Sequence, residues 1–331
     1  MPKLTSELSL AIESLQKGKL VAFPTETVFG LGGDATNQEA IKRIYKVKGR
    51  PSNRPLILHV PNLETVKKIV LDWSLNESKL AKKFWPGPLT LILKNGNLIS
   101  QSAVAGKKTV AIRIPSHPFA LSMLRSFSEI GSGIVAAPSA NRFGYVSTTN
   151  ARDVEFSLQN YLDETDVIVN SSPRNNCQFG LESTIVDCTT NSPKILRVGV
   201  IKKSEIESCI GKTVDVGLTE DGKIDYPGTC SSHYSPKTKF KVMTRAQIEL
   251  NLSKLCEGGK TFLWYFQKPV KTSQNLTAEV APSTAPEYGR QLYSKLNNLD
   301  RRGLNLIIFE EPPTGEDWNA ICDRLEKAKS R

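Results

Sequence analysis

The spacing of apolar residues along the first two hundred positions predicts short strands mixed with helices. Leu8, Ala11, Ile12 and Leu15 fall on one face of a helix that Gly18 ends. A second helix is expected over residues 38–47. Short apolar runs bounded by glycine, proline and polar residues predict strands at 20–23, 56–60, 89–93, 110–114, 134–137, 167–169, 184–187 and 195–198. Residues 1–210 therefore read as one strand-rich, mixed α/β domain.

The pattern is more regular after residue 240. Strands are expected near 240, at 261–266 and at 304–309, and helices at 246–256, 286–299 and 318–329. This alternation predicts a small parallel sheet with crossover helices, a three-layer Rossmann-like domain over 240–331. Residues 211–239 show no sustained period and carry Gly217, Gly222, Pro227 and Pro236, so we expect a linker there.

Composition excludes several classes of protein. No apolar run reaches the ~18 residues of a membrane span, and the N-terminus lacks the order of a signal peptide, so we expect a cytoplasmic protein with no membrane partner. The six cysteines form no CxxC pair, and with three histidines no zinc site can be recognised. The chain has 44 basic against 33 acidic residues, a net charge of +11, which favours an anionic partner.

One short block holds more than half of this net charge. No acid occurs between Glu39 and Glu64, whereas the basic residues there are Lys42, Arg43, Lys46, Lys48, Arg50 and Arg54. Prolines at 51 and 55 restrict the loop that presents the last three cations, as recognition of a phosphate group requires. An RNA-binding module that uses residues 42–54 is the alternative, although Tyr45 is the one aromatic residue available for stacking in that block.

Three further segments carry polar groups at strand ends. Strict alternation puts Thr109, Ala111 and Arg113 on one sheet face, so Arg113 either lines a cavity or lies on a solvated face. Ser139 and Asn141 end an apolar strand two residues apart. The glycine-rich segment 30–35 matches the dinucleotide-binding pattern, but proline and polar residues separate it from the preceding strand, and we expect a polar loop instead.

Together these segments resemble the YrdC-type threonylcarbamoyl-AMP synthases, in collinear order over about residues 5–210. The motifs that carry the resemblance are Pro24 to Gly32, Lys48 to Pro51 with Arg54 to Leu56, Phe84 to Thr90, Arg113 to Pro115, Ala137 to Asn141, Glu182 to Asp187 and Arg197 to Gly199. The C-terminal domain is similar to that of the long form of the enzyme. The related carbamoyl-transfer enzyme of hydrogenase maturation has paired CxxC motifs, which are missing here. The resemblance implies a twisted mixed sheet whose helices enclose a basic cavity.

The resemblance also implies a reaction. The family converts L-threonine, bicarbonate and ATP to threonylcarbamoyl-AMP and pyrophosphate, for the N6-threonylcarbamoyladenosine modification of tRNA. Mg²⁺ is expected with the triphosphate, held mainly by phosphate and water, and a tRNA threonylcarbamoyl transferase complex is the expected downstream partner. Direct binding of tRNA is not required.

Roles for individual residues follow from matching the motifs. Catalysis would involve Lys48, Arg50, Ser139 and Asn141. The ATP site would comprise Lys48, Arg50, Arg54, Thr109, Ser139, Asn141, Ser147, Arg197 and Tyr234. L-Threonine would be held by Thr27, His59, Arg113, Ala137 and Ser183, with Arg113 at its carboxylate.

The linker departs from the family pattern. Long-form members have a Pro-Gly run with basic residues before His-Tyr, whereas here Pro227 to Ser232 lack those cations and His233 and Tyr234 remain. We expect this segment to cover the pocket, with Tyr234 near the nucleotide but with less electrostatic attraction.

Overall fold

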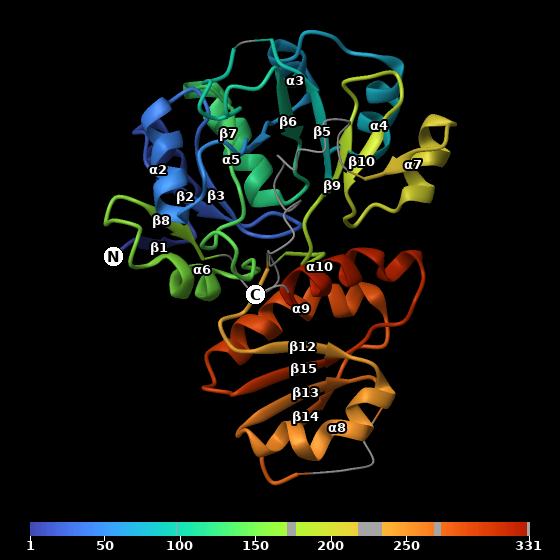
Figure 1. Cartoon of the computed structure of the whole chain (residues 1–331). Helices are drawn as coiled ribbons and strands as arrows, with labels where there is room; N and C mark the ends of the chain where they lie inside the picture. Colours follow the sequence, from blue (N-terminus) through green and yellow to red (C-terminus); the bar gives the residue numbers. More distant parts are fainter. Residues whose placement is uncertain (97, 171–176, 218–233, 268–272, 330–331) are drawn as a thin grey trace. The chain divides into compact units, whose positions relative to one another are not determined.

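The computed structural model describes the whole chain except residues 97, 171–176, 218–233, 268–272 and 330–331. The chain divides into two compact units (Figure 1). The first comprises Met1–Phe143 and Ser147–Cys230, and the second comprises Gly144–Val146 and Ser231–Arg331.

The first unit is built on one mixed sheet with the strand order β1-β8-β2-β3-β7-β4-β6-β5-β9-β10-β11. Parallel and antiparallel neighbours alternate irregularly along it, as expected for a mixed α/β fold. In this order the strands are β1 (Lys3–Thr5), β8 (Val167–Val169), β2 (Val21–Phe23), β3 (Gly30–Asp34), β7 (Val135–Ala136), β4 (Ile57–His59), β6 (Thr109–Arg113), β5 (Leu89–Lys94), β9 (Thr184–Asp187), β10 (Lys194–Arg197) and β11 (Asp215–Val216).

Helices cover both faces of this sheet. Because side chains alternate along a strand, Val21 and Phe23 of β2 pack on α1 (Leu8–Gln16) and α5 (Pro118–Ile130), while Ala22 joins the larger core on the opposite face. The helices that contribute to that larger core are α2 (Gln38–Lys48), α3 (Leu63–Ile69), α4 (Leu75–Phe84), α6 (Ala151–Leu158) and α7 (Lys203–Ile210).

Two expectations for this unit need correction. Residues 30–34 form strand β3 and not a polar loop. A Cβ atom at Gly32 would lie 2.7 Å from both the Phe23 ring and Val135, so this glycine allows close packing and does not cradle a phosphate. In addition, β11 lies inside the stretch for which the sequence predicts a linker, and it pairs in parallel with β10.

The second unit has the predicted three-layer form. Its four strands are parallel in the order β12-β15-β13-β14, and β14 was not predicted. Helix α8 packs on one face through Ile248, Leu252 and Cys256, and α9 and α10 lie along the other face (Figure 1). The bounds are β12 (Phe240–Met243), α8 (Arg245–Glu257), β13 (Thr261–Tyr265), β14 (Leu276–Val280), α9 (Ala285–Asp300), β15 (Leu306–Glu310), the 3₁₀ turn Glu316–Trp318 and α10 (Asn319–Lys329).

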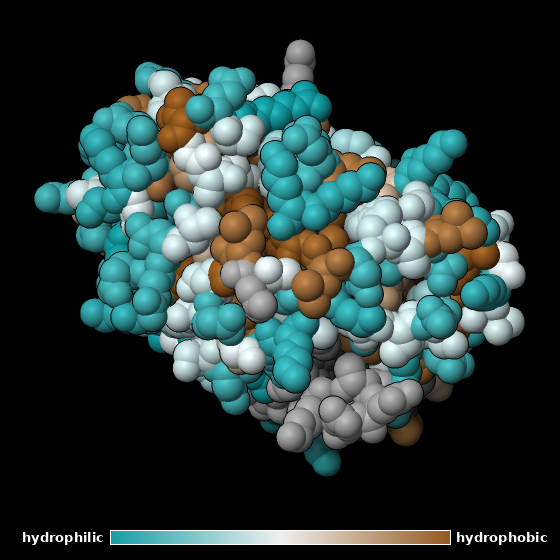
Figure 2. Space-filling model, turned by 90° about the horizontal axis from the view of Figure 1, so that it is seen from above, coloured by the Kyte–Doolittle hydropathy of each residue, from teal (hydrophilic) through white to brown (hydrophobic). Residues whose placement is uncertain are grey.

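Most large apolar side chains are buried, with a few exceptions at the surface. Leu71, Leu75 and Leu98 are 68%, 69% and 54% exposed. On the face drawn in Figure 2, hydrophobic residues gather near the middle and hydrophilic residues surround them. Among the described helices, none is both long and apolar enough to cross a membrane. The cysteines that the structure describes are all free thiols.

A glycine in the loop after β10, Gly199, allows a close contact with the backbone of residues 182–184. A Cβ at Gly199 would lie 2.4 Å from the Thr184 backbone nitrogen and 2.6 Å from the Glu182 carbonyl oxygen. We predict that Gly199→Ala lowers the free energy of unfolding by about 1–3 kcal/mol, because the backbone at 182–184 must shift.

Chemical denaturation measures this effect. Gly258→Ala is the matched control, since nothing lies within 4 Å of a Cβ at that position and its φ of −73° suits alanine. Equal stability of the two variants would contradict the predicted backbone clash.

Candidate functional site

Strand register brings the predicted polar residues to one face of the first unit's sheet. His59 of β4 lies beside Arg113 of β6, and Ile57 beside Ala111. Thr90 of β5 and Arg197 of β10 are both register partners of Ile185 in β9, and so share its face. The apolar part of this face is a small cluster of Ile57, Ile92, Ala111 and Ile185.

Arg113 lies at the centre of the predicted threonine group and is buried, with 4% of its surface exposed. Its Nε donates to the Gly87 carbonyl at 3.2 Å, and its Nη1 donates to Thr27 Oγ1 at 2.8 Å. Its Nη2 lies 2.7 Å from Glu26 Oε1. Arg113 therefore lines a buried site and does not lie on a solvated face.

Glu26 is a site residue to which the sequence analysis gave no role, although it lies within a quoted motif. Its carboxylate is 2% exposed. Burial raises the pKa of Glu26, but the Arg113 guanidinium and the backbone N–H groups of Glu26 and Ser116 together outweigh burial and hold the pKa below its ordinary value. In the sequence, the one signal that could have identified Glu26 is its position between Thr25 and Thr27, shortly after a buried strand.

His59 and Ala137 lie on the same face. Burial, and secondarily the Arg113 guanidinium, lower the pKa of His59 to about 3, so its ring is neutral at physiological pH. The imidazole ring packs edge-on against the Phe23 ring, with 6.2 Å between the two ring centres. The Ala137 backbone N–H donates to the Ile57 carbonyl at 2.9 Å, which holds Ala137 beside β4.

Ser183 connects three strands. Its hydroxyl lies 2.7 Å from Thr90 Oγ1, and it accepts a hydrogen bond from Arg197 Nη2 at 3.0 Å. Arg197 Nε also donates to the Ser183 carbonyl at 3.0 Å. The structure therefore joins Arg197, predicted for ATP, to Ser183, predicted for threonine.

Lys48, at the end of α2, is tied to the segment that carries Ser139 and Asn141. Its ammonium group donates to both of their backbone carbonyls at 2.5 Å. Burial lowers the pKa of Lys48 well below its ordinary value, and the Arg50 and Arg142 guanidinium groups lower it further. Within the described part of the chain, Lys48 has no carboxylate partner, so a bound anion would compensate its charge.

The two arginines of the basic loop lie beside one aromatic ring. The guanidinium carbons of Arg50 and Arg54 are 5.7 and 5.4 Å from the centre of Phe143. Arg50 also donates to the Pro55 carbonyl at 3.1 Å. Phe143 was not predicted as a site residue, because it lies outside the quoted motifs.

Two other predicted ATP residues have separate surroundings. Ser147 donates to Glu182 Oε1 at 2.7 Å, which links it to the segment that carries Ser183. Thr109 lies on the same face of β6 as Arg113 but four residues away, roughly 13 Å along the strand. Of the predicted nucleotide residues, Thr109 and Arg197 therefore share the sheet face of Arg113.

Tyr234 belongs to the second unit. Its ring stacks on Tyr293 with centres 5.6 Å apart, and the Arg324 guanidinium carbon lies 5.3 Å from the ring centre. Its predicted contact with the nucleotide stays a prediction. Residues 227–233, including His233, which the sequence predicts to cover the pocket, lie outside the described residues.

The basic block does not form a continuous cationic surface. Lys42 pairs with Glu39 at 2.7 Å, and Arg43 pairs with Asp166 at 2.7 Å. Lys48 and Arg50 are only 2% and 7% exposed. A flat RNA-binding surface needs exposed cations, so this arrangement favours a buried anion over RNA.

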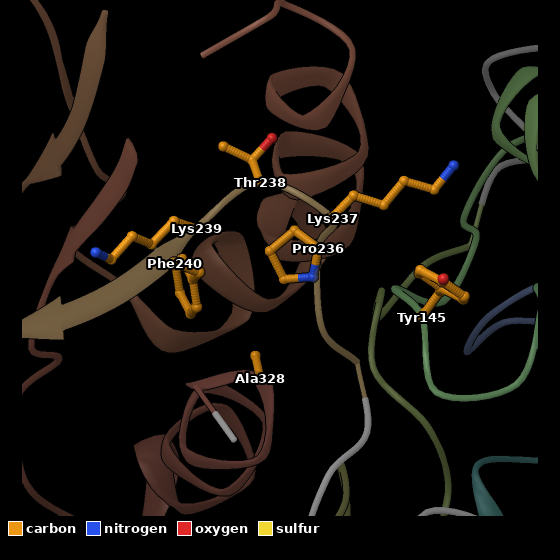
Figure 3. A pocket seen from close by; sticks show the side chains of 7 residues that line it. All are labelled: Tyr145, Pro236, Lys237, Thr238, Lys239, Phe240 and Ala328. Carbon is orange, nitrogen blue, oxygen red and sulfur yellow. The ribbon is translucent and has the colours of Figure 1, made fainter. Parts of the chain in front are cut away.

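A cavity of about 300 Å³ in the second unit is separate from the predicted site residues (Figure 3). The side chains of Lys237 and Lys239 extend in different directions there, so their ammonium groups do not converge on one point. The residues that line the cavity are Tyr145, Pro236, Lys237, Thr238, Lys239, Phe240 and Ala328.

Taken together, the predicted site residues of the first unit and their partners include buried groups suited to anions. Among them the buried cations, Lys48, Arg50, Arg113 and Arg197, exceed the buried carboxylates, Glu26 and Glu182, by two charges. Cations that the fold holds away from water bind anions strongly, and can stabilise charge that develops on a phosphate group during reaction.

Known proteins match this chain in both units. A family model described as "Telomere recombination" matches residues 13–199, and one described as "Threonylcarbamoyl-AMP synthase, C-terminal domain" matches residues 201–330. A threonylcarbamoyl-AMP synthase of Pyrococcus abyssi is 33% identical over 97% of this chain and 94% of its own length. That of Bacillus subtilis is 34% identical over 97% of this chain and 92% of its own length.

A solved structure agrees with these matches. The crystal structure of Pyrococcus abyssi Sua5 complexed with L-threonine has a TM-score of 0.87 and 32% identity, covering 99% of this chain and 97% of that chain. The fold, the order of the motifs and both family models therefore agree, and the chain belongs to the long form of the threonylcarbamoyl-AMP synthase family, the enzymes that make threonylcarbamoyl-AMP.

Proposed function

We propose that this chain joins L-threonine, bicarbonate and ATP into threonylcarbamoyl-AMP, with release of pyrophosphate and water. The amino nitrogen of threonine attacks the carbon of bicarbonate, and loss of water leaves a carbamate. A carbamate oxygen then attacks the α-phosphorus of ATP, and the bond from that phosphorus to the bridging oxygen of the β-phosphate breaks. Neither step requires a nucleophile from the protein, so catalysis rests on positioning and electrostatic stabilisation.

The observation that carries this proposal is the presence of two kinds of buried cationic group in the first unit. Arg113, fixed by Gly87 and Thr27, suits the carboxylate of an amino acid. Lys48 and Arg50, buried beside the Ser139–Asn141 segment, suit a polyphosphate. A bound triphosphate would supply the negative charge that Lys48 lacks among the described residues.

The predicted roles of the remaining residues stay proposals. Arg54, Thr109, Ser147 and Arg197 would complete the nucleotide site, with Tyr234 as a further candidate. Thr27, His59, Ala137 and Ser183 would surround threonine. Because His59 is neutral at physiological pH, it would offer hydrogen bonding and shape but no charge.

Mg²⁺ is proposed as the companion of the triphosphate. The ion would be held mainly by phosphate oxygens and water, because the matched motifs contain few carboxylates. When bound, the ion would neutralise part of the phosphate charge.

The product implies a partner reaction. A mixed anhydride of a carbamate and a phosphate is a reactive acyl donor, so a transferase must move the threonylcarbamoyl group onto the adenosine of tRNA. We propose that this chain supplies such a transferase complex in the cytoplasm.

The first test of the proposed function is pyrophosphate release. With ATP, Mg²⁺, bicarbonate and L-threonine, we expect release that requires every one of these components. Coupled phosphate detection measures it, and mass spectrometry identifies the adenylate. Release that does not depend on threonine, or tight RNA binding without any release, would contradict the proposal.

A pair of variants tests the division of the site. Arg113→Ala should raise the KM for L-threonine roughly a hundredfold, because a charge-assisted bidentate contact is lost, and should leave the Kd of ATP within about twofold. Arg50→Ala should raise the Kd of ATP roughly a hundredfold and leave the KM for L-threonine within about twofold. Steady-state kinetics and calorimetry with a non-hydrolysable ATP analogue measure both constants, and a similar effect of both variants on both ligands would rule out two separate subsites.

A further inference from the structure

Glu26 is a buried charge that the proposed reaction does not use. Its side chain is 2% exposed, and its Oε1 lies 2.7 Å from Arg113 Nη2. The backbone N–H groups of Glu26 and Ser116 are its other polar neighbours. A carboxylate offers about four lone-pair sites, so this one retains acceptor capacity beyond these contacts.

The two groups of predicted ligand residues in the first unit, here called the threonine end and the nucleotide end, differ in net charge. At the threonine end, Arg113 and Glu26 cancel each other, and His59 is neutral. At the nucleotide end, the buried cations Lys48, Arg50 and Arg197 outnumber the single buried carboxylate, Glu182. The first end therefore suits a ligand without net charge, and the second suits a polyanion.

This difference matters because both substrates carry anionic groups. An unpaired Arg113 would attract a phosphate or any carboxylic acid as readily as an amino acid. At neutral pH threonine is a zwitterion, whose carboxylate and ammonium group match a neighbouring arginine and glutamate. Specificity of this kind uses a repulsive group against the wrong ligand as well as an attractive one for the right ligand.

We propose that Glu26 is a specificity-determining residue of the threonine subsite. It accepts a hydrogen bond from the ammonium group of the amino acid and, by cancelling the charge of Arg113, excludes anions that lack this group. After the amine has become an anionic carbamate, the same carboxylate repels it toward the cations of the nucleotide end. The inference rests on the proposed function, because it assumes that Arg113 faces the carboxylate of threonine.

A purely orienting role for Glu26 makes a different prediction. If Glu26 served only to hold Arg113 in place, its removal would weaken every ligand that uses Arg113 by a similar factor. If it selects by charge, its removal weakens the zwitterion and strengthens the simple anion. The ratio of the affinity for the zwitterion to the affinity for the simple anion therefore distinguishes the two roles.

The test uses L-threonine and 3-hydroxybutanoate, which keeps the carboxylate, hydroxyl and methyl groups of threonine but lacks the ammonium group. Both are titrated calorimetrically into the full chain, saturated with a non-hydrolysable ATP analogue in bicarbonate-free buffer so that no reaction occurs. Glu26→Gln should weaken L-threonine roughly tenfold to a hundredfold and tighten 3-hydroxybutanoate several-fold. Glu26→Asp, which keeps the charge, should retain the wild-type order of affinities.

Glu77→Gln is the matched control, because it removes another buried carboxylate, at the start of α4, outside the polar face. It should leave both affinities unchanged. A parallel change of both ligands in Glu26→Gln, or no change in either, overturns the proposal.

The wild-type protein provides a test that does not depend on the variants folding. It should bind L-threonine at least tenfold more tightly than 3-hydroxybutanoate, and equal affinities overturn the inference while the proposed function stands. A wild-type chain that binds the ATP analogue but no L-threonine contradicts the proposed function itself.

Discussion

The burial of charged side chains inside the first unit is the constraint on which this structure depends. Arg113 and Glu26 are almost wholly removed from water, yet each is costly to bury alone. Their mutual contact, together with the bonds from Arg113 to Gly87 and Thr27, keeps both charges in place. Removing one partner would leave the other uncompensated, so the chemistry of the site and the stability of the fold share the same residues.

The nucleotide end meets the same constraint differently. Lys48 donates to two backbone carbonyls and not to a carboxylate, so its charge is hydrogen-bonded but not neutralised by the described residues. Such a cation raises the free energy of the empty protein and lowers that of a complex with an anion. A triphosphate bound beside Lys48, as proposed, would thus gain part of its affinity from charge that the fold leaves uncompensated.

The sequence predicted these features unevenly, for physical reasons. Alternation along a strand is a local property, and so the face of Arg113 could be predicted from residues 109–115 alone. The contacts of Arg113 with Glu26 and Gly87 could not, because these residues reach it only through long-range pairing of strands and loops, and Thr27 was grouped with Arg113 only through the family resemblance. The prediction of a loop at the glycines of β3 was wrong for a related reason. Glycine favours loops by local preference, but here the ring of Phe23 requires it within a strand.

What the net charge of +11 implies for binding depends more on where the cations lie than on how many there are. Within the basic block, Lys42 is matched by Glu39 at the surface, where such a pair contributes little to stability, and Arg43 is matched by the buried Asp166. Lys46 is exposed and Arg54 is half-buried, whereas the fold withdraws Lys48 and Arg50 from solvent. A charge at the surface acts through water and is screened by salt, whereas a buried charge acts at close range in a medium of lower polarity. By composition alone, the excess of positive charge suggests a nucleic-acid partner. In the folded chain, the buried part of that charge suits a small anion instead.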